Sequence, residues 1–324
     1  MSVVLGIDLG GTALKWAVRP PDATARDLIA HGSMPTGADR TAIVAAMTDL
    51  VHRVDVEHGR VHAVGVGVPG HVDRATGVVR FLPNVSGDWG GFPLGAALRR
   101  DTGRPITVLN DARAFCLAEL TMGAARGRRD ALFLTLGTGV GGGVAVGGRL
   151  LVGSDDRLGE IGHLTYDRSG PRCGCGNRGC LELYASGPAL VRGLRERTGR
   201  RPDSPRAVVA AADAGDGPAA EVLARAGRAI GETLASLCAV LPAEVAVIGG
   251  GVAAGLPALR PHIERALAER AEFIGPVAVV AAALGPMAGA LGAALAASSH
   301  PDEPSGRAAT GRSHRADEPE RRST

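Results

Sequence analysis

Short apolar runs alternate with longer segments of helical periodicity along most of the chain. The short runs are bounded by glycine, proline or charged residues, which is typical of buried strands. We predict strands at residues 3–7, 16–19, 27–33, 61–68, 105–109, 132–136, 144–146, 244–248 and 277–282. Apolar residues at helical spacing predict helices at residues 39–57, 112–120, 186–197, 206–214, 217–240, 261–271 and 287–297. This alternation predicts an α/β protein, and 324 residues with 45% hydrophobic content can bury the cores of about two domains.

Two pairs of predicted strands are joined by glycine-rich turns. The first turn and its flanks contain Asp8, Gly10, Gly11, Thr12 and Lys15. The second turn spans residues 137–143 and contains Thr138 and Gly139. Such turns present backbone N–H groups to an anion, and a carboxylate at the strand end could hold a metal through water. Each pattern alone is also that of an ordinary hairpin, and neither is the Walker pattern, in which a glycine loop opens a helix. Two of them in one chain predict related halves that grip a nucleotide between two domains.

Three cysteines and one histidine gather in a glycine-rich stretch at residues 159–182. The four candidate ligands are His163, Cys173, Cys175 and Cys180. Three thiolates and one imidazole make a complete tetrahedral set for Zn2+ and leave no position for water, so we interpret the zinc as structural. The alternative is a group of buried free thiols beside an unrelated histidine. Glu160 and Glu182 flank the cluster as candidate carboxylates.

Polar side chains and glycines also follow other predicted strands. Asn110 and Asp111 come directly after the strand at residues 105–109, at the carboxyl end where α/β folds place ligands. Asp111 could equally be the N-cap of the helix that it opens. Asn84 lies in a loop, where it either binds a polyol or caps a turn. Gly249 to Gly251 end a later strand and would allow a planar ring to approach the backbone.

Composition and charge narrow the classes of function. The net charge is +3, aromatic residues make up only 3% of the chain, and no basic stretch is interleaved with aromatics, so we expect no nucleic-acid binding. No apolar run approaches the ~18 residues of a membrane span, and the first residues lack a signal-peptide pattern. Cys116 and Cys238 lie in apolar helical segments, and the odd total of five cysteines is typical of a reducing compartment, so we expect a cytoplasmic protein without membrane association. Residues 298–324 are polar and predict a disordered tail.

Four motifs, taken in order, resemble the ROK family (repressor, open reading frame, kinase), and within it the bacterial glucokinase-type sugar kinases. They are VLND at residues 108–111, LTLGTGVGGG at 134–143, GEIGH at 159–163 and CGCGNRGCLE at 173–182. The resemblance covers nearly all of residues 3–297 and implies an actin-like (ribonuclease H-like) two-domain α/β fold that closes on ATP and a sugar. The implied N-terminal domain comprises residues 1–111 and the helix at 287–297. The implied C-terminal domain comprises residues 112–286, with the zinc loop at 159–182.

The resemblance also implies roles for the candidate residues. The implied reaction is ATP-dependent phosphorylation of a hexose 6-hydroxyl, with glucose as the first expectation and with Mg2+ and structural Zn2+ as metals. Asp111 matches the family's catalytic base. The implied sugar-binding set is Asn84, Asn110, Asp111, Glu160, His163 and Glu182. The implied nucleotide-binding set is Asp8, Gly10, Gly11, Thr12, Lys15, Thr138, Gly139, Gly249, Gly250 and Gly251. His163 would then serve both the zinc and the sugar, and the protein would be a homodimer or homotetramer.

Other functions within the family stay open. A kinase for fructose, N-acetylglucosamine or N-acetylmannosamine would use the same catalytic residues, and relatives that use polyphosphate usually lack the cysteine loop. The chain departs from the usual family pattern at His71, in the charged segment 153–157 and in the bulky helix after Asp111. A sugar sensor that does not bind DNA is a further alternative. Only seven residues precede Asp8, too few for the helix-turn-helix domain of family repressors.

Overall fold

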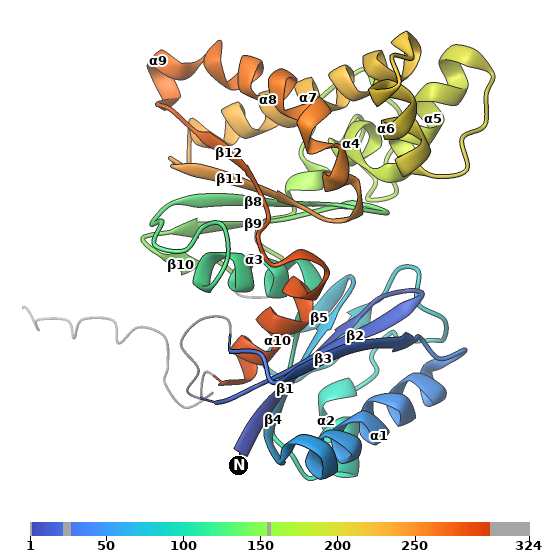
Figure 1. Cartoon of the computed structure of the whole chain (residues 1–324), viewed down its shortest axis with the longest axis vertical. Helices are drawn as coiled ribbons and strands as arrows, with labels where there is room; N and C mark the ends of the chain where they lie inside the picture. Colours follow the sequence, from blue (N-terminus) through green and yellow to red (C-terminus); the bar gives the residue numbers. More distant parts are fainter. Residues whose placement is uncertain (1, 22–26, 154–156, 299–324) are drawn as a thin grey trace, which may run out of the picture.

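The computed structural model describes residues 2–21, 27–153 and 157–298 and shows two α/β halves stacked along the long axis of the molecule (Figure 1). The first half holds a five-stranded sheet in the order β3-β2-β1-β4-β7. Its strands are β1 (Ser2–Leu9), β2 (Ala13–Arg19), β3 (Ala30–Pro35), β4 (Arg60–Val68) and β7 (Ile106–Asn110). The helices packed on it are α1 (Arg40–His58), α2 (Leu94–Thr102) and α10 (Ala288–Ser298). Because β1 runs antiparallel to β2 and parallel to β4, the sheet is mixed.

Successive residues of β1 face two different helical layers, as the alternation of a strand requires. Leu5 and Ile7 belong to the core that α1 and α2 complete. The opposite face lies under α10, a helix made mostly of alanine, glycine and leucine. A Cβ atom on Gly6 would overlap the carbonyl oxygen of Ala290. The glycine in β1 therefore lets the backbone of α10 lie directly against the sheet.

The second half repeats the plan with a sheet in the order β10-β9-β8-β11-β12. Its strands are β8 (Ala131–Leu136), β9 (Val140–Val146), β10 (Arg149–Leu150), β11 (Val245–Gly249) and β12 (Ala278–Ala281). Its helices are α3 (Asp111–Thr121), α4 (Glu182–Ala185), α5 (Gly187–Thr198), α6 (Pro205–Asp213), α7 (Gly217–Cys238), α8 (Leu256–Ala268) and α9 (Ala271–Ile274). Short 3-10 turns are η1 (Ile161–His163), η2 (Gly251–Gly255) and η3 (Gly285–Met287). Leu132 and Leu134 pack toward α7 and α8, whereas Phe133 packs toward α3.

Helices α3 and α10 lie between the two sheets and join the halves (Figure 1). Phe115 of α3 and Leu291 of α10 belong to one apolar cluster with residues of the second sheet. A Cβ atom on Gly292 would overlap the carbonyl oxygen of Ala114, so the two helices touch along their backbones. The C-terminal helix therefore packs on the first sheet, in accord with the implied domain plan, while the boundary at residue 111 stays a prediction.

One expectation about the second glycine turn is wrong. Strand β9 begins at Val140, so Gly141, Gly142 and Gly143 lie inside the strand and the turn itself is only residues 137–139. A Cβ atom on Gly143 would approach the Sγ of Cys116 to 2.5 Å. Gly141 and Gly143 are thus required by the close packing of α3 on the sheet, and Gly142 by the close approach of Ile161. Tertiary packing therefore explains a composition that resembles that of a turn.

Other element boundaries also differ from the sequence predictions. The third strand is displaced to Ala30–Pro35, and the helix expected from residue 261 begins at Leu256. Proline favours the first helical turn, and Pro257 takes that place while Pro261 lies inside α8. Sequence reasoning missed α2 and the small hairpin of β5 (His71–Asp73) and β6 (Val78–Phe81).

Two sequence predictions fall largely outside the described residues. The expected tail lies beyond them except for Ser298, which closes α10 instead of beginning the tail. Within the charged segment, residues 154–156 also lie outside. Across residues 2–21, 27–153 and 157–298, none of the helices has the length and apolar character that crossing a membrane requires.

Candidate functional site

A cleft of about 550 Å³ opens between the two halves. Its walls include Asp8 and Lys15 from the first strand pair, Asp111 from the start of α3, and Gly249 to Gly251 after β11. Asp8 and Lys15 are direct neighbours across β1 and β2. Residues from both ends of the chain and from its middle thus meet at one place, as the nucleotide hypothesis requires.

Asn110 and Asp111 have different roles at the junction of β7 and α3: the first caps the helix and the second lines the cleft. The N-cap of α3 is Asn110, whose Oδ1 accepts a hydrogen bond from the N–H of Arg113 at 3.1 Å. Its Nδ2 donates to the carbonyl of Gly70 at 2.9 Å. The interpretation of Asp111 as the N-cap is therefore wrong, because the preceding residue already fills that position. The Asp111 carboxylate accepts a hydrogen bond from the N–H of Ala112 at 2.8 Å, and it lines the cleft.

The Asp111 carboxyl group has an unusual affinity for protons. Burial, and after it the nearby negative charge of Asp8, together raise its pKa to about 7. The pKa of Asp8 is itself raised by burial, against the opposing effect of Lys15. A carboxylate whose pKa lies near neutrality can both accept a proton from a substrate hydroxyl and release it again.

The four predicted metal ligands come together in one cluster. Their ligand atoms all lie within 4.8 Å of one another, with 3.7 Å from His163 Nδ1 to Cys173 Sγ and 3.7 Å from Cys175 Sγ to Cys180 Sγ. Sulfur atoms at ~2.3 Å from a tetrahedral zinc are separated by ~3.8 Å. The 3.7 Å between the sulfur atoms of Cys175 and Cys180 matches the edge of such a site. The donor set and its spacing therefore fit zinc.

The loop around the cluster is fixed by its own backbone. The N–H of Cys173 donates to the carbonyl of Asn177 at 2.8 Å, and the N–H of Gly176 donates to the carbonyl of Cys173 at 3.0 Å. The side chain of Asn177 lies 3.4 Å from the Sγ of Cys180 and donates to the Oγ1 of Thr165 at 2.9 Å. Sequence reasoning missed Asn177, although its place within the cysteine motif is a signal for a residue that supports the ligands.

Glu182 connects the cysteine loop to the second glycine turn. It opens α4 two residues after Cys180, and its Oε2 accepts a hydrogen bond from the N–H of Val140 at 3.0 Å. A Cβ atom on Gly139 would lie 2.5 Å from that same oxygen. The turn therefore needs a glycine at position 139, because the carboxylate occupies the space that a side chain would fill.

Glu160 is held by an arginine that sequence reasoning missed. Arg113, on the first turn of α3, is 1% exposed, and its Nη2 lies 3.0 Å from Oε1 of Glu160. Its Nη1 donates to the carbonyl of Gly142 in β9. A buried arginine two positions after a candidate catalytic aspartate is the signal that could have revealed it. Through this side chain, the helix that carries Asp111 also positions Glu160.

The remaining candidates lie outside the lining of the cleft. Asn84 has a φ of 60°, a left-handed conformation that asparagine tolerates better than most residues, and its carbonyl lies where a Cβ atom on Gly11 would approach to 2.5 Å. Thr12 and Thr138 are exposed at the two glycine turns. The 550 Å³ cleft itself is not lined by Asn84, Asn110, Glu160, His163, Glu182, Gly10, Gly11, Thr12, Thr138 or Gly139.

Only one of the three glycines at the end of β11 and directly after it leaves space for a ligand. A Cβ atom on Gly249 would meet the ring of Phe115 at 2.6 Å, and Gly250, with a φ of 89°, lies against the backbone of Leu136. No atom lies within 4 Å of a Cβ atom built on Gly251, which lines the cleft. Thr135 and Arg206 also line the cleft without having been predicted from the sequence.

Comparison with known proteins places this geometry in a family. The family model of the ROK family matches residues 4–300, and the chain belongs to that family. It is 35% identical over 306 residues to a glucokinase of Thermotoga maritima, covering 90% of this chain and 96% of that one. It is 36% identical over 301 residues to an N-acetylmannosamine kinase of Shigella flexneri, covering 91% and 98%. A ROK family glucokinase from Streptomyces griseus, solved with glucose and AMPPNP, superposes with a TM-score of 0.77 at 33% identity, covering 91% and 99%.

These matches confirm the expected fold. The two mixed sheets, with the cleft between them, form the actin-like α/β architecture of the ROK sugar kinases. The cluster of His163, Cys173, Cys175 and Cys180 is the possible metal site that the cysteine spacing predicted.

Proposed function

We propose that this protein transfers the γ-phosphate of ATP to the 6-hydroxyl of a hexose, most readily glucose. The observation that carries the proposal is the carboxylate of Asp111, which lies in the cleft between the halves with its pKa raised to about 7. Sugar kinases are the class shared by the glucokinase and N-acetylmannosamine kinase relatives. The structure solved with glucose and AMPPNP supports ATP as the phosphoryl donor.

Asp111 would act as the general base. A sugar hydroxyl is too weak an acid to attack phosphorus unaided, and a carboxylate within hydrogen-bond reach takes its proton as the new P–O bond forms. A pKa near 7 keeps a large fraction of Asp111 ionised at neutral pH while leaving it basic enough to hold the proton. Asn110 caps α3 and thereby fixes the helix turn on which the base stands.

The phosphates would be held at the opposite side of the cleft. Lys15 supplies a positive charge beside Asp8 on the wall of the cleft, and the turns at residues 10–12 and 137–139, which lie outside that wall, would add backbone N–H groups. Asp8 is the candidate to hold Mg2+ through water, and that ion would spread the charge of the transferring phosphoryl group. Gly251 leaves the open surface that an adenine ring could approach.

Zinc would brace the sugar side of the site. His163 presents Nδ1 to the cysteines, which leaves its Nε2 for a sugar hydroxyl. Bound zinc would supply a fixed charge and a rigid loop, with no role in the chemical step. Glu182, two residues after the last cysteine, extends this rigidity to the glycine turn at Val140.

A second candidate function differs from the first in the sugar that is phosphorylated. The N-acetylmannosamine kinase of Shigella flexneri is as similar to this chain as the glucokinase of Thermotoga maritima, at 36% and 35% identity. Both activities would use Asp111, the glycine turns and the zinc loop. The difference would lie in the pocket that accepts either a hydroxyl or an N-acetyl group at the sugar's second carbon.

A coupled assay of ADP release tests the proposal. Mg-ATP is supplied with glucose, fructose, mannose, N-acetylglucosamine or N-acetylmannosamine, and kcat/KM is compared across the panel. Highest turnover with glucose supports the leading proposal, whereas highest turnover with N-acetylmannosamine replaces it by the second function. Absence of turnover with every sugar contradicts both. The Asp111→Asn variant is the control for contaminating kinases, since it must lose the activity while keeping sugar binding.

A further inference from the structure

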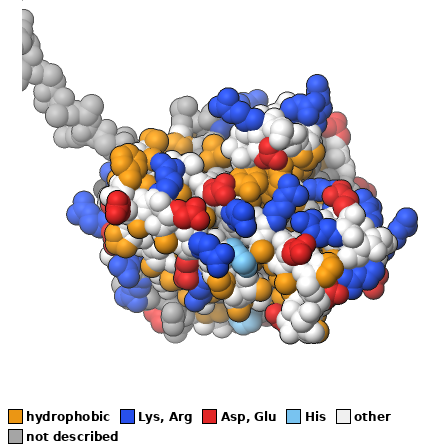
Figure 2. All heavy atoms as spheres, turned by 90° about the horizontal axis from the view of Figure 1, so that it is seen from above, with side chains coloured by type: hydrophobic (Ala, Val, Ile, Leu, Met, Phe, Trp, Pro, Cys, Tyr) orange, Lys and Arg blue, Asp and Glu red, His pale blue; other side chains and the backbone are white. Residues whose placement is uncertain are grey.

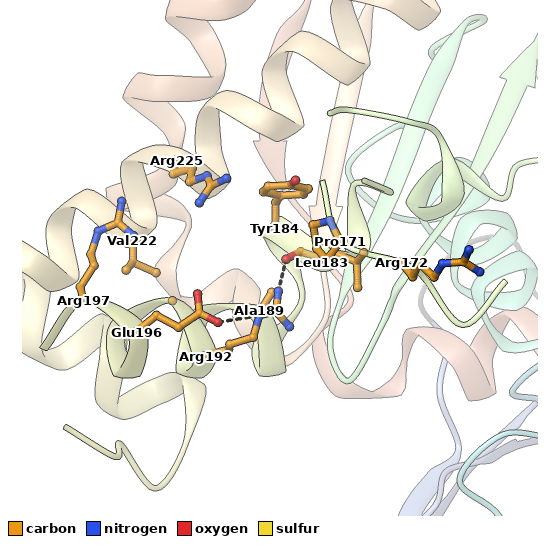
Figure 3. A pocket seen from close by; sticks show the side chains of 11 residues that line it. Pro171, Arg172, Leu183, Tyr184, Ala189, Arg192, Glu196, Arg197, Val222 and Arg225 are labelled. Carbon is orange, nitrogen blue, oxygen red and sulfur yellow. Dashed lines mark hydrogen bonds and ion pairs between the residues drawn. The ribbon is translucent and has the colours of Figure 1, made fainter. Parts of the chain in front are cut away.

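A second concave site lies in the second half, away from the interdomain cleft. The end of the molecule seen in Figure 2 carries basic, acidic and apolar side chains side by side, so charge alone does not single out a site there. A pocket of about 410 Å³ indicates a site, because several arginines line it. Figure 3 shows that Arg192, Glu196 and Arg197 of α5 and Val222 and Arg225 of α7 surround it. We call this pocket the arginine groove.

One arginine of the groove stacks on an aromatic ring, and the N–H donors of its guanidinium group remain available. The guanidinium of Arg225 lies 4.8 Å from the ring centroid of Tyr184. The hydroxyl of Tyr184 donates to Oδ2 of Asp167 at 3.0 Å, which fixes the ring. Within the described ranges, the Arg225 side chain makes no hydrogen bond or ion pair. Stacking engages the face of a guanidinium and leaves its edge N–H groups free to bind an anion.

Two further arginines of the groove, Arg192 and Arg197, are only loosely neutralised. Arg192 Nε lies 3.7 Å from Oε1 of Glu196, whose side chain is 61% exposed. Arg197 Nε lies 3.4 Å from Oε2 of Glu221, whose side chain is 71% exposed. Exposed ion pairs of this kind contribute little to stability, because water screens both charges. An anion with two charges can therefore displace these glutamates at little cost.

The walls between the arginines are apolar and close-packed. Ala189 and Gly193 on α5 face Val222 on α7, and Leu183 closes one end. A Cβ atom on Gly193 would lie 3.3 Å from Cγ1 of Val222, so a larger residue there would fill the space between the helices. Such walls favour an organic body attached to the anion over a bare inorganic ion.

We propose that the arginine groove binds a small organic phosphate monoester. Planar guanidinium groups match phosphate oxygens by paired hydrogen bonds, and Arg192, Arg197 and Arg225 reach the groove from two helices. The phosphate would replace the glutamates as partner of Arg192 and Arg197, while the carbon skeleton lies on the apolar walls.

The groove is connected to the proposed active site through α4. This helix carries Glu182 at its first position, where the carboxylate holds the N–H of Val140 at the glycine turn, and Tyr184 under Arg225. Arg192 also donates to the carbonyl of Leu183 between them. A phosphate monoester in the groove would therefore shift α4 and change the KM for sugar or ATP. This regulatory part rests on the proposed kinase activity, whereas the binding part does not.

Calorimetric titration tests the binding. The probes are fructose 1,6-bisphosphate, glycerol 3-phosphate and inorganic phosphate, with unphosphorylated fructose as the blank, each up to about 10 mM at low salt because the contact is largely electrostatic. We expect an organic phosphate to bind more tightly than inorganic phosphate. The Arg197→Gln/Arg225→Gln variant should weaken that binding by about tenfold or more, as expected for loss of charged hydrogen bonds. Arg195→Gln is the matched control, because Arg195 is exposed on α5 outside the groove.

The possible outcomes distinguish binding in the groove from an effect of that binding on kinase activity. Absence of binding by all three probes, or equal loss in Arg195→Gln, overturns the groove as an anion site. Arg197→Gln alone guards against misfolding of the double variant, because this side chain is exposed and should lower affinity without changing the thermal midpoint. Binding that leaves KM and kcat unchanged keeps the site and overturns the coupling through α4. Absence of kinase activity with binding intact contradicts the proposed function alone.

Discussion

The pH dependence of turnover is the sharpest consequence of the electrostatics at Asp111. Its pKa is raised to about 7 by burial and by Asp8, and a general base acts only in its ionised form. With a pKa of about 7, roughly one tenth of the molecules carry the ionised base one pH unit lower and roughly nine tenths one unit higher. We therefore expect kcat/KM to rise about tenfold per pH unit on the acid side and to level off above neutrality. An Asp111→Asn variant should bind sugar but turn it over at a small fraction of the normal rate.

The measurement is initial rates from about pH 5.5 to 8.5, with the sugar phosphate quantified directly so that coupling enzymes impose no pH dependence of their own. Asp8→Asn removes one cause of the raised pKa, so the midpoint should move to lower pH even if the overall rate falls. A flat profile across this range would refute the assignment of Asp111 as the base. So would an Asp111→Asn variant with nearly normal kcat.

The same raised pKa makes a prediction about stability. An acid whose folded-state pKa exceeds its unfolded value is penalised when ionised, so the penalty is absent below about pH 4 and complete above about pH 7. The shift corresponds to at most about 4 kcal/mol, and water that reaches the partly exposed carboxylate reduces it. Asp111→Asn should therefore gain stability over the natural protein as pH rises through this window. Asp213→Asn, at an exposed site on α6, is the control that should show no such trend.

Three further predictions concern the groups around the site. Gly139→Ala places a methyl group 2.5 Å from the Glu182 carboxylate, so it should displace the glycine turn and raise the KM for ATP, measured by steady-state kinetics; an unchanged KM would contradict the contact. Arg113→Met removes the partner of Glu160 and should raise the sugar KM about tenfold, as for loss of a charged hydrogen bond, with a smaller effect on kcat; equal effects on both would indicate a merely structural role. Cys173→Ser should lower the zinc content and the thermal midpoint together, checked by elemental analysis and calorimetry, and a stable variant without metal would rule out a structural zinc.

The local chemistry of this protein could be derived from the sequence because the chain itself keeps the groups close. Cys173, Cys175 and Cys180 lie within one short loop, so the reach of a few residues limits where their sulfur atoms can go. The same holds for Asn110 and Asp111 at the end of a predicted strand, although the sequence offered Asp111 as the helix cap and the structure gives that role to Asn110. The resemblance to the ROK family, confirmed by the family match, supplied the two-domain fold.

Pairings between distant segments were decided only by the tertiary structure. Arg113 meets Glu160 across 47 positions and Val140 meets Glu182 across 42, and neither pairing leaves a periodic pattern in the sequence. The sequence placed the glycines of β9 in a turn, because composition does not reveal the tertiary packing against the strand.

The proximity of Asp8 and Asp111, and with it the raised pKa of the proposed base, depends on packing of the same kind. Glycines in the sheets and in α10 let the backbones of α3 and α10 lie in contact with each other and with both sheets. The sequence therefore determined which groups are present and which neighbours they have along the chain. Close packing between layers decided which of them act on one another, because burial and short distances between charges exist only once the two halves have closed together.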